Sequence, residues 1–156
     1  MADGAPRVVF VCWGNICRSP MAERVARQWF ADAGVVAEVT SAGVSSEELG
    51  NPIDRRARRV LEDAAYDATG HRARQAGAEE IRAADLVIAA EDHHAERIRR
   101  LVPDARVRLI SDFDPEAAPG DPLPDPWYGD HTDFLDTLDA IERAMPGIIE
   151  AVRELG

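Results

Sequence analysis

The sequence predicts an α/β fold, a single-domain three-layer sandwich in which a four-stranded parallel sheet lies between layers of helices. Short apolar runs of strand length alternate along the chain with longer segments in which apolar residues recur every three or four positions. Such alternation is typical of a parallel sheet that helices cover on both faces. The chain has 156 residues, a length that suits one hydrophobic core, so we expect residues 1–156 to form one domain.

Four short segments are predicted to be the strands of this sheet. They cover residues 7–11, 36–41, 85–90 and 106–110. The first contains the sequence Val-Val-Phe-Val, an uninterrupted apolar stretch that is typical of a strand buried on both faces. Because helical patterns separate the runs, the strands are expected to pair in parallel through crossover connections.

Four further segments are predicted to be helices. They cover approximately residues 19–34, 52–66, 92–101 and 132–155. Ser19 and Pro20 indicate the start of the first helix, with Ser19 as its N-cap and Pro20 at the first helical position. Pro146 predicts a kink in the last helix.

A long loop separates the fourth strand from the last helix. It spans residues 111–131 and is rich in aspartate and proline. Loops of this length inside compact domains are usually functional or disordered. The loop is therefore a candidate source of functional side chains.

The charge and composition of the chain exclude several functions. The net charge is −11, whereas nucleic-acid-binding proteins usually present a basic surface, so no nucleic acid partner is expected. All 18 basic residues are arginine, so the chain has neither a Schiff-base lysine nor the lysine of a nucleotide-binding P-loop. Two cysteines, Cys12 and Cys17, are too few for a disulfide framework or a four-ligand zinc site. We expect no metal and no cofactor.

The sequence shows no targeting or membrane segment. Residues 1–6 are small and polar, unlike a signal peptide with its basic and apolar regions. No apolar run approaches the ~20 residues that a transmembrane helix requires. A cytoplasmic location without membrane contact is therefore expected, and secretion without a signal peptide stays open.

The segment between the first strand and the first helix is placed to bind an anion. Residues 13–19 follow the carboxyl end of a strand, where open parallel sheets bind ligands, and lead into a helix N-terminus with free N–H groups. Gly14 and Asn15 tolerate the unusual backbone angles of a loop that wraps around an anion. Position alone therefore predicts an anion-binding loop.

Cys12 and Arg18 flank this loop with the spacing Cys-x5-Arg. A thiolate near a helix N-terminus and a guanidinium is stabilised, which makes it a nucleophile at neutral pH. The arginine fork matches two phosphate oxygens, and Ser19 can donate a hydrogen bond to the sulfur. These groups suit in-line attack on a phosphate monoester through a phosphocysteine intermediate. The competing interpretation, a nucleotide-phosphate loop with an incidental cysteine, lacks the required glycines or lysine.

The residues around Cys12 resemble a known family. The run Val-Cys-Trp-Gly-Asn-Ile-Cys-Arg-Ser-Pro at 11–20 resembles the signature of the low-molecular-weight protein tyrosine phosphatases. Further motifs follow in the family's order, namely Ser-Ala-Gly at 41–43, Gly-Asn-Pro at 50–52, His-Arg-Ala-Arg-Gln at 71–75 and Asp-Pro-Trp-Tyr-Gly-Asp at 125–130. The resemblance implies a flavodoxin-like (phosphatase I-like) fold and hydrolysis of protein phosphotyrosine and small aryl phosphates. A phosphotyrosine-containing protein is then the expected partner, and the enzyme is expected to be monomeric.

The resemblance also assigns roles within the long loop. Asp125 matches the family's general acid, which protonates the phenolate leaving group of phosphotyrosine. Trp127 and Tyr128 match the aromatic wall that holds the substrate ring, and the competing interpretation for both is ordinary core packing. The other aspartates of the loop are expected to be solvated turn residues.

Further positions are assigned to the phosphate-binding loop and its support. The loop residues expected to bind substrate are Trp13, Gly14, Asn15, Ile16, Cys17 and Ser19. Asn15 and His71 match a hydrogen-bonded pair that braces the loop, and Ser41 belongs to the same brace. For His71, an ordinary surface histidine stays open as an alternative.

The chain departs from the family's pattern at three places. Many members have a hydroxyl residue where this chain has Val44, and an aromatic residue where it has Glu47. The Met-Asp pair that is common after the third strand is Ala90-Glu91 here. None of these departures is expected to touch the chemistry. We expect Trp13 to replace the missing aromatic wall from the floor of the cleft, leaving a pocket that is narrow at its base and acidic at its rim.

Other activities on similar scaffolds fit the residues less well. An arsenate reductase needs further cysteines to relay a disulfide, and beyond Cys17 there is none. A phosphocysteine carrier domain of a sugar transport system has no use for Arg18 together with a general acid. A non-catalytic phosphate-binding module does not need Cys12 and Asp125 as well. A phosphoarginine phosphatase stays open as an alternative.

Overall fold

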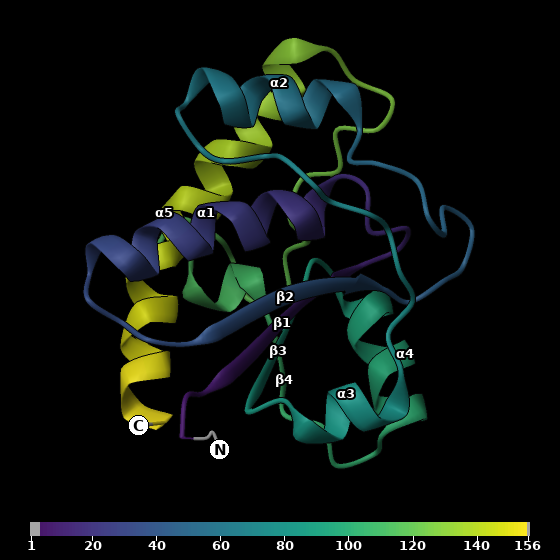
Figure 1. The fold of residues 1–156 in the computed structure, drawn as a ribbon, viewed down its shortest axis with the longest axis vertical. Coiled ribbons are helices and arrows are strands. Elements are labelled where there is room, and N and C mark those ends of the chain that lie inside the picture. The colour runs from purple at the N-terminus through teal and green to yellow at the C-terminus, as the bar shows by residue number, and fades with distance from the viewer. Residues whose placement is uncertain (1–3, 156) are drawn as a thin grey trace.

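The computed structural model describes residues 4–155, which form one parallel sheet between helices (Figure 1). Its strands are β1 (Arg7–Cys12), β2 (Glu38–Gly43), β3 (Leu86–Ala89) and β4 (Val107–Leu109). They pair in the order β2-β1-β3-β4, and every pair is parallel. The predicted α/β fold with a four-stranded parallel sheet is confirmed, with small shifts of the strand ends.

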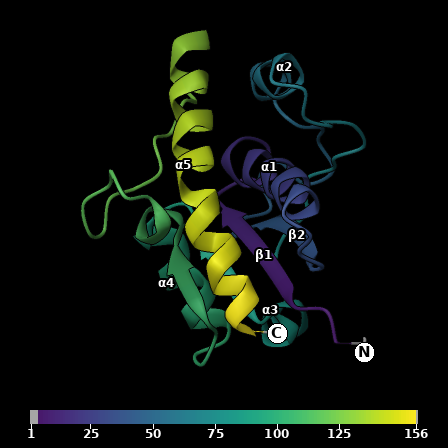
Figure 2. The ribbon, with the colours of Figure 1, turned by 90° about the vertical axis from the view of Figure 1, so that its left-hand side faces the viewer.

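Residues 4–155 include five α-helices and one short 3-10 helix. They are α1 (Arg18–Asp32), α2 (Arg55–Asp63), α3 (Ala78–Ala83), α4 (Asp92–Leu101), η1 (Ile110–Phe113) and α5 (His131–Leu155). Helices α1 and α5 cover one face of the sheet, whereas α3 and α4 cover the other (Figure 1, Figure 2). Helix α2 packs outside this layer, against α1 and α5.

Strand β1 is buried on both faces, as its unbroken apolar run predicts. Val8 and Phe10 pack into the core on the side of α1 and α5. Val9 and Val11 pack into the core on the side of α3 and α4, because side chains alternate along a strand. This central strand ends at Cys12, which therefore lies at the carboxyl edge of the sheet.

Two elements and several helix boundaries differ from the sequence pattern. Helix α3 has six residues and buries one side chain, Ile81, so it carries no readable helical period. The 3-10 helix η1 occupies the start of the loop predicted for residues 111–131. Helix α2 begins later than predicted, because the Asp54 carboxylate accepts hydrogen bonds from the N–H groups of Arg56 and Ala57 and caps it there.

The start of α1 also differs. The helix begins at Arg18, with Cys17 at the N-cap position and no side-chain cap, so the assignment of Ser19 as N-cap is wrong. The Ser19 hydroxyl instead lies 3.0 Å from Cys12 Sγ. Pro20 falls in the first turn, where a missing N–H leaves no helical hydrogen bond unmade. The N–H groups at the start of α1 are thus left without a side-chain cap.

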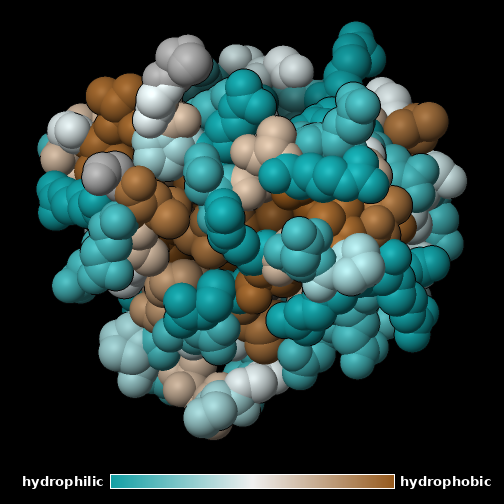
Figure 3. Space-filling model, turned by 90° about the horizontal axis from the view of Figure 1, so that it is seen from below, coloured by the Kyte–Doolittle hydropathy of each residue, from teal (hydrophilic) through white to brown (hydrophobic). Residues whose placement is uncertain are grey.

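Helix α5 runs on through Pro146 and extends beyond the sheet towards α2 (Figure 2). Within residues 4–155, no helix combines the length and apolar character that crossing a membrane requires. From below, the side on which β1 begins and α5 ends, hydrophobic side chains form a broken band among hydrophilic ones (Figure 3). The carboxyl end of β1 lies away from that side.

The strand order determines where a ligand can bind. The chain passes from β1 to β2 on one side and then returns to β3 on the other, so the connections after β1 and β3 diverge. In open α/β sheets, ligands bind in the crevice outside the carboxyl ends of the strands at such a point. The predicted anion-binding loop follows β1 at this position.

Candidate active site

The loop between β1 and α1, residues 13–17, leaves its N–H groups free while most of its carbonyl groups accept hydrogen bonds. The carbonyl oxygens of Cys12, Trp13 and Ile16 accept hydrogen bonds from backbone N–H groups of the segments after β2 and before α2. None of the N–H groups of residues 13–17 donates a hydrogen bond to another residue in the range 4–155. Free N–H groups in a tight loop beside a helix N-terminus form a nest for an anion.

Asn15 holds this loop in shape. Its φ angle is 61°, in the left-handed region that asparagine adopts more readily than most residues. Its buried Nδ2 donates to Ser19 Oγ and to Ser41 Oγ, both at 2.9 Å. Its Oδ1 accepts a hydrogen bond from the N–H of Arg74 at 3.1 Å. Hydrogen bonds to three other residues thus offset the strained backbone.

A buried carboxylate and a histidine complete this support. Ser41 Oγ donates to Glu23 Oε1 at 2.6 Å, and Glu23 also pairs with two arginines. His71 Nε2 donates to the Asn15 carbonyl oxygen at 2.6 Å, which places the ring proton on Nε2. Burial lowers the pKa of His71, although that hydrogen bond opposes the shift. The structure therefore brings Asn15, Ser41 and His71 together in one hydrogen-bonded network.

The two cysteines have different surroundings. Cys12 is buried, and its Sγ is within hydrogen-bond distance of the Ser19 hydroxyl. Burial raises the pKa of the Cys17 thiol well above its usual range, and the charge of Asp54 adds to this shift. Cys17 therefore stays protonated at neutral pH. This leaves Cys12 as the candidate nucleophile.

Arg18 points its guanidinium at three neighbours. Nη1 donates to Glu91 Oε2 at 2.9 Å and to the carbonyl oxygen of Leu123 at 2.8 Å. Nη2 lies 3.6 Å from Asp125 Oδ2. Because Arg18 is only 5% exposed, these contacts fix the direction of the planar fork.

Glu91 therefore contacts Arg18, which the sequence pattern does not predict. Whether Ala90-Glu91 leaves the chemistry untouched stays a prediction. Burial alone would raise the pKa of Glu91, but the hydrogen bond from Arg18 and its positive charge outweigh burial and lower it. The carboxylate is thus ionised at neutral pH and pairs with the guanidinium. The position of Glu91, directly after the third strand, could have indicated its role. The segments that follow the parallel strands β1 and β3 meet at one edge of the sheet.

Asp125 and the two aromatic residues beyond it lie on the same side of the molecule as Arg18. Asp125 Oδ1 accepts the N–H of Trp127 at 3.1 Å, and the Asp125 side chain is 55% exposed. The guanidinium of Arg56 lies 5.5 Å from the centroid of the Trp127 ring, and Trp127 is 40% exposed. Tyr128 is 98% exposed. Ordinary core packing, the competing interpretation for both aromatic residues, is therefore wrong.

These residues line one open cavity of about 320 Å³ at the carboxyl end of β1. The lining residues are Cys12, Trp13, Gly14, Ile16, Cys17, Arg18, Glu47, Glu48, Asp125, Trp127 and Tyr128. The cavity thus joins the candidate nucleophile, guanidinium, carboxylic acid and aromatic wall. Asn15 and Ser19, which are expected to bind substrate, contribute no lining surface and instead support the loop through their side chains, as Ser41 and His71 do.

Trp13 forms a side of this cavity near its rim. Its Nε1 donates to Glu47 Oε2 at 2.6 Å. Its ring stacks on that of His93, with centroids 5.4 Å apart and an angle of 17° between the planes. The guanidinium of Arg97 lies 4.8 Å from the centroid of the Trp13 ring. Because Glu47 and His93 are both exposed, the ring lies towards the rim, and the expectation that it forms the floor is wrong.

His94 is a buried residue that the sequence pattern does not single out. It is 2% exposed, and its Nδ1 has no hydrogen-bond partner among residues 4–155. Burial lowers the pKa of His94 to about 4, and the positive charge of Arg18 adds to the shift. The imidazole is therefore neutral at pH 7 and places no second positive charge next to Arg18.

Comparisons with known proteins agree with this geometry. The family model for low molecular weight phosphotyrosine protein phosphatase matches residues 7–155. A low molecular weight protein-tyrosine phosphatase A of Mycobacterium tuberculosis is 44% identical over 151 residues, which cover 94% of this chain and 91% of that protein.

Solved structures show the same fold. A protein tyrosine phosphatase of Entamoeba histolytica superposes with a TM-score of 0.89 at 26% identity, covering 96% of this chain and 98% of that one. The YwlE arginine phosphatase, from Bacillus subtilis, superposes with a TM-score of 0.85 at 25% identity, covering 96% and 99%. Because the family model spans nearly the whole sequence and the relative from Mycobacterium is 44% identical, the chain belongs to the low molecular weight phosphotyrosine protein phosphatase family.

Proposed function

We propose that this protein hydrolyses phosphotyrosine in proteins, and small aryl phosphates, through a phosphocysteine intermediate on Cys12. The observation that carries the proposal is the set of free N–H groups in residues 13–17. Cys12 precedes this loop, and Arg18, the first residue of α1, follows it. Negative charge that develops on the equatorial oxygens of a reacting phosphoryl group meets donors that are already in place.

The reaction has two steps. In the first, the Cys12 thiolate attacks phosphorus, the S–P bond forms as the P–O bond to tyrosine breaks, and Asp125 gives its proton to the departing phenolate oxygen. In the second, water attacks the phosphocysteine, Asp125 takes a proton from that water, and inorganic phosphate and the thiolate are released. Arg18 binds two phosphate oxygens in both steps. Ser19 stabilises the sulfur when it is the leaving group, because its hydroxyl lies 3.0 Å away.

The substrate ring lies between aromatic residues of the cavity. Trp127 forms one wall, and Trp13 forms another in place of the aromatic residue expected at Glu47. Flat aromatic walls hold a phenyl ring at little entropic cost. Tyr128, which is nearly fully exposed, borders the entrance and meets the protein substrate rather than the ring.

The proposal extends to partner, assembly and location. The partner is a phosphotyrosine-containing protein and not a nucleic acid. A monomer is proposed because one chain brings Cys12, Arg18 and Asp125 to the same cavity. A cytoplasmic location is consistent with a nucleophilic thiol that must remain reduced. Light scattering of the purified protein and fractionation of cells test the last two statements.

Hydrolysis of para-nitrophenyl phosphate and of a phosphotyrosine peptide by the wild type and by Cys12→Ser tests the proposed reaction. The wild type should turn over both substrates in the presence of a chelator, and Cys12→Ser should turn over neither. Cys17→Ser, the matched substitution, should lower turnover far less because that thiol stays protonated. Turnover by Cys12→Ser, or a wild type that prefers a phosphoarginine peptide to the phosphotyrosine peptide, would overturn the proposal.

A further inference from the structure

The mouth of the cavity carries two carboxylates, Glu47 and Glu48, that have no counter-ion among residues 4–155. Glu47 accepts its hydrogen bond from the indole of Trp13, and Glu48 accepts one from the side-chain amide of Asn51 at 2.9 Å. Both donors are neutral. Within residues 4–155, no arginine or histidine forms a salt bridge with either carboxylate. The mouth therefore presents uncompensated negative charge.

Both carboxylates are held in position. The indole that binds Glu47 is itself fixed by its stacking on His93 and its contact with Arg97. The Glu48 side chain lies against Gly14, where a Cβ atom would come within 3.0 Å of Glu48 Cγ. Glycine at this loop position thus leaves space for the carboxylate at the mouth. A larger residue there would push Glu48 away.

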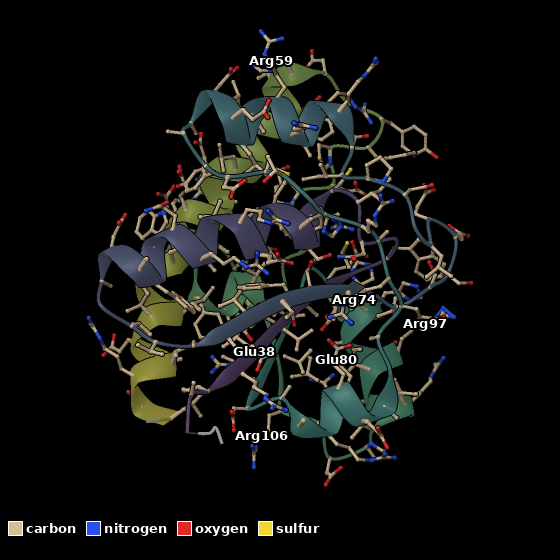
Figure 4. The ribbon with its side chains drawn as sticks, in the orientation of Figure 1. Glu38, Arg59, Arg74, Glu80, Arg97 and Arg106 are labelled. Carbon is tan, nitrogen blue, oxygen red and sulfur yellow. The ribbon has the colours of Figure 1, made fainter. Side chains whose placement is uncertain are left out.

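Nearby positive charge does not neutralise this mouth. Arg56 contacts the Trp127 ring but does not line the cavity and is paired with Asp54. Arg97 contacts the Trp13 ring but does not line the cavity, and its side chain projects from α4 at the edge of the molecule (Figure 4). Arg18 does line the cavity, but it is 5% exposed and paired with Glu91. The net charge of −11 adds to the negative potential. A phosphate dianion therefore approaches against repulsion unless the substrate also carries positive charge.

Resting on the proposed function, we propose that this mouth selects phosphotyrosines that have an arginine or lysine beside them in the sequence, with Glu47 and Glu48 as the specificity-determining residues that bind this cation. A guanidinium or ammonium group on a neighbouring residue turns the repulsion at the mouth into attraction. Arginine also matches a carboxylate with two parallel hydrogen bonds. An acidic neighbour meets two like charges and is disfavoured.

Three synthetic phosphotyrosine peptides that differ only in the flanking residues, arginine, alanine or glutamate, test this selection. We expect kcat/KM to fall in that order, with each carboxylate contributing about two- to fivefold, as exposed ion pairs do. The preference should shrink as salt is added, because exposed charges are screened. Glu47→Gln and Glu48→Gln should each lower the ratio of kcat/KM for the arginine peptide to that for the glutamate peptide. Glutamine keeps an oxygen acceptor for Trp13 or Asn51, so each substitution isolates the charge.

The double substitution Glu150→Gln/Glu154→Gln, at the exposed end of α5, is the matched control because it changes the net charge as much as the double substitution at the mouth. This control should leave the ratio of kcat/KM for the arginine peptide to that for the glutamate peptide unchanged. Glu47→Gln/Glu48→Gln should bring that ratio close to one. Equal kcat/KM for all three peptides, or a ratio that survives in the mouth variant, would overturn the proposed selection. Para-nitrophenyl phosphate has no flanking residues, so a wild type inactive on it would instead overturn the proposed function.

Discussion

Arg18 and Glu91 form an ion pair at the carboxyl edge of the sheet, with 2.9 Å between Nη1 and Oε2. Arg18 is the first residue of α1, and Glu91 follows β3. The parallel pairing of β1 with β3 brings these distant positions together. Nη2 remains directed towards Asp125, at the cavity. A carboxylate that does not line the cavity thus orients the guanidinium that is proposed to bind phosphate.

Glu91→Gln should lower kcat/KM for para-nitrophenyl phosphate by about tenfold, because a hydrogen bond between two charged groups is worth ~1.5–3 kcal/mol and an amide replaces only part of it. The inhibition constant of inorganic phosphate should rise by a similar factor, since the same guanidinium binds the product. Steady-state kinetics of the wild type and of Glu91→Gln measure both effects. Glu96→Gln, an exposed substitution on α4, is the control. Unchanged kinetics in Glu91→Gln would mean that other contacts alone orient Arg18.

Asp125→Asn should slow hydrolysis of phosphotyrosine by roughly 10²–10⁴, the usual contribution of a general acid. The loss should be smaller for para-nitrophenyl phosphate, whose leaving group is more acidic and needs less help from a proton donor. The kcat values of the two substrates, compared in both proteins, measure this difference. Asp121→Asn is a matched control from the same loop, where the carboxylate accepts the N–H of Ala118 instead. Equal losses for the two substrates would exclude the assignment of Asp125.

The parts of the site that are local in the chain are predictable from the sequence. Cys12, Arg18 and the loop between them lie within one strand–loop–helix unit, so their spacing alone places them around an anion. The central strands β1 and β3 are predictable for the same reason, because each contains a short, uninterrupted apolar run. The role of Asp125 in the long loop rests on the resemblance to the family, since an aspartate in a loop has no distinguishing local pattern.

The residues that sequence reasoning misplaces act through contacts between distant segments. Glu91 and His94 reach the site because β3 pairs with β1. Trp13 lies at the rim rather than the floor because its indole binds Glu47 and its ring stacks on a histidine of α4. Ser19 resembles an N-cap by position, but its hydroxyl instead contacts the side chains of Cys12, at the end of β1, and Asn15, in the loop. Which hydrogen-bond or stacking partner each of these side chains takes depends on the tertiary structure, and no local sequence pattern encodes it.

Burial of His94 predicts a loss of stability in mild acid. Burial lowers its pKa from 6.5 to about 4, so between these values the unfolded chain binds a proton that the folded chain does not. The free energy of unfolding therefore falls as the pH drops through this window, by at most about 3 kcal/mol from this residue. The pKa of His71 is also lowered by burial, so His71 acts in the same direction.

Urea unfolding at about pH 7 and about pH 5 measures this loss. His94→Asn should lose less stability over the interval than the wild type, because asparagine has no proton to bind. His131→Asn, a substitution of an exposed histidine, should behave as the wild type does. Identical losses in the wild type and His94→Asn would show that the folded protein accommodates a protonated His94.

Trp13 and Glu47 should together determine which aryl groups the cavity accepts. Trp13→Ala removes a wall that is fixed by Glu47, His93 and Arg97, so it should weaken binding of phosphotyrosine and favour bulkier aryl phosphates. Glu47→Trp places an aromatic residue at the rim and should tighten phosphotyrosine binding. The measurement is kcat/KM for phosphotyrosine and for naphthyl phosphate in the wild type and both variants. Leu49→Ala, an exposed substitution close by that does not line the cavity, is the control. If the ratio of the two kcat/KM values is the same in all four proteins, neither Trp13 nor Glu47 shapes the space around the substrate ring.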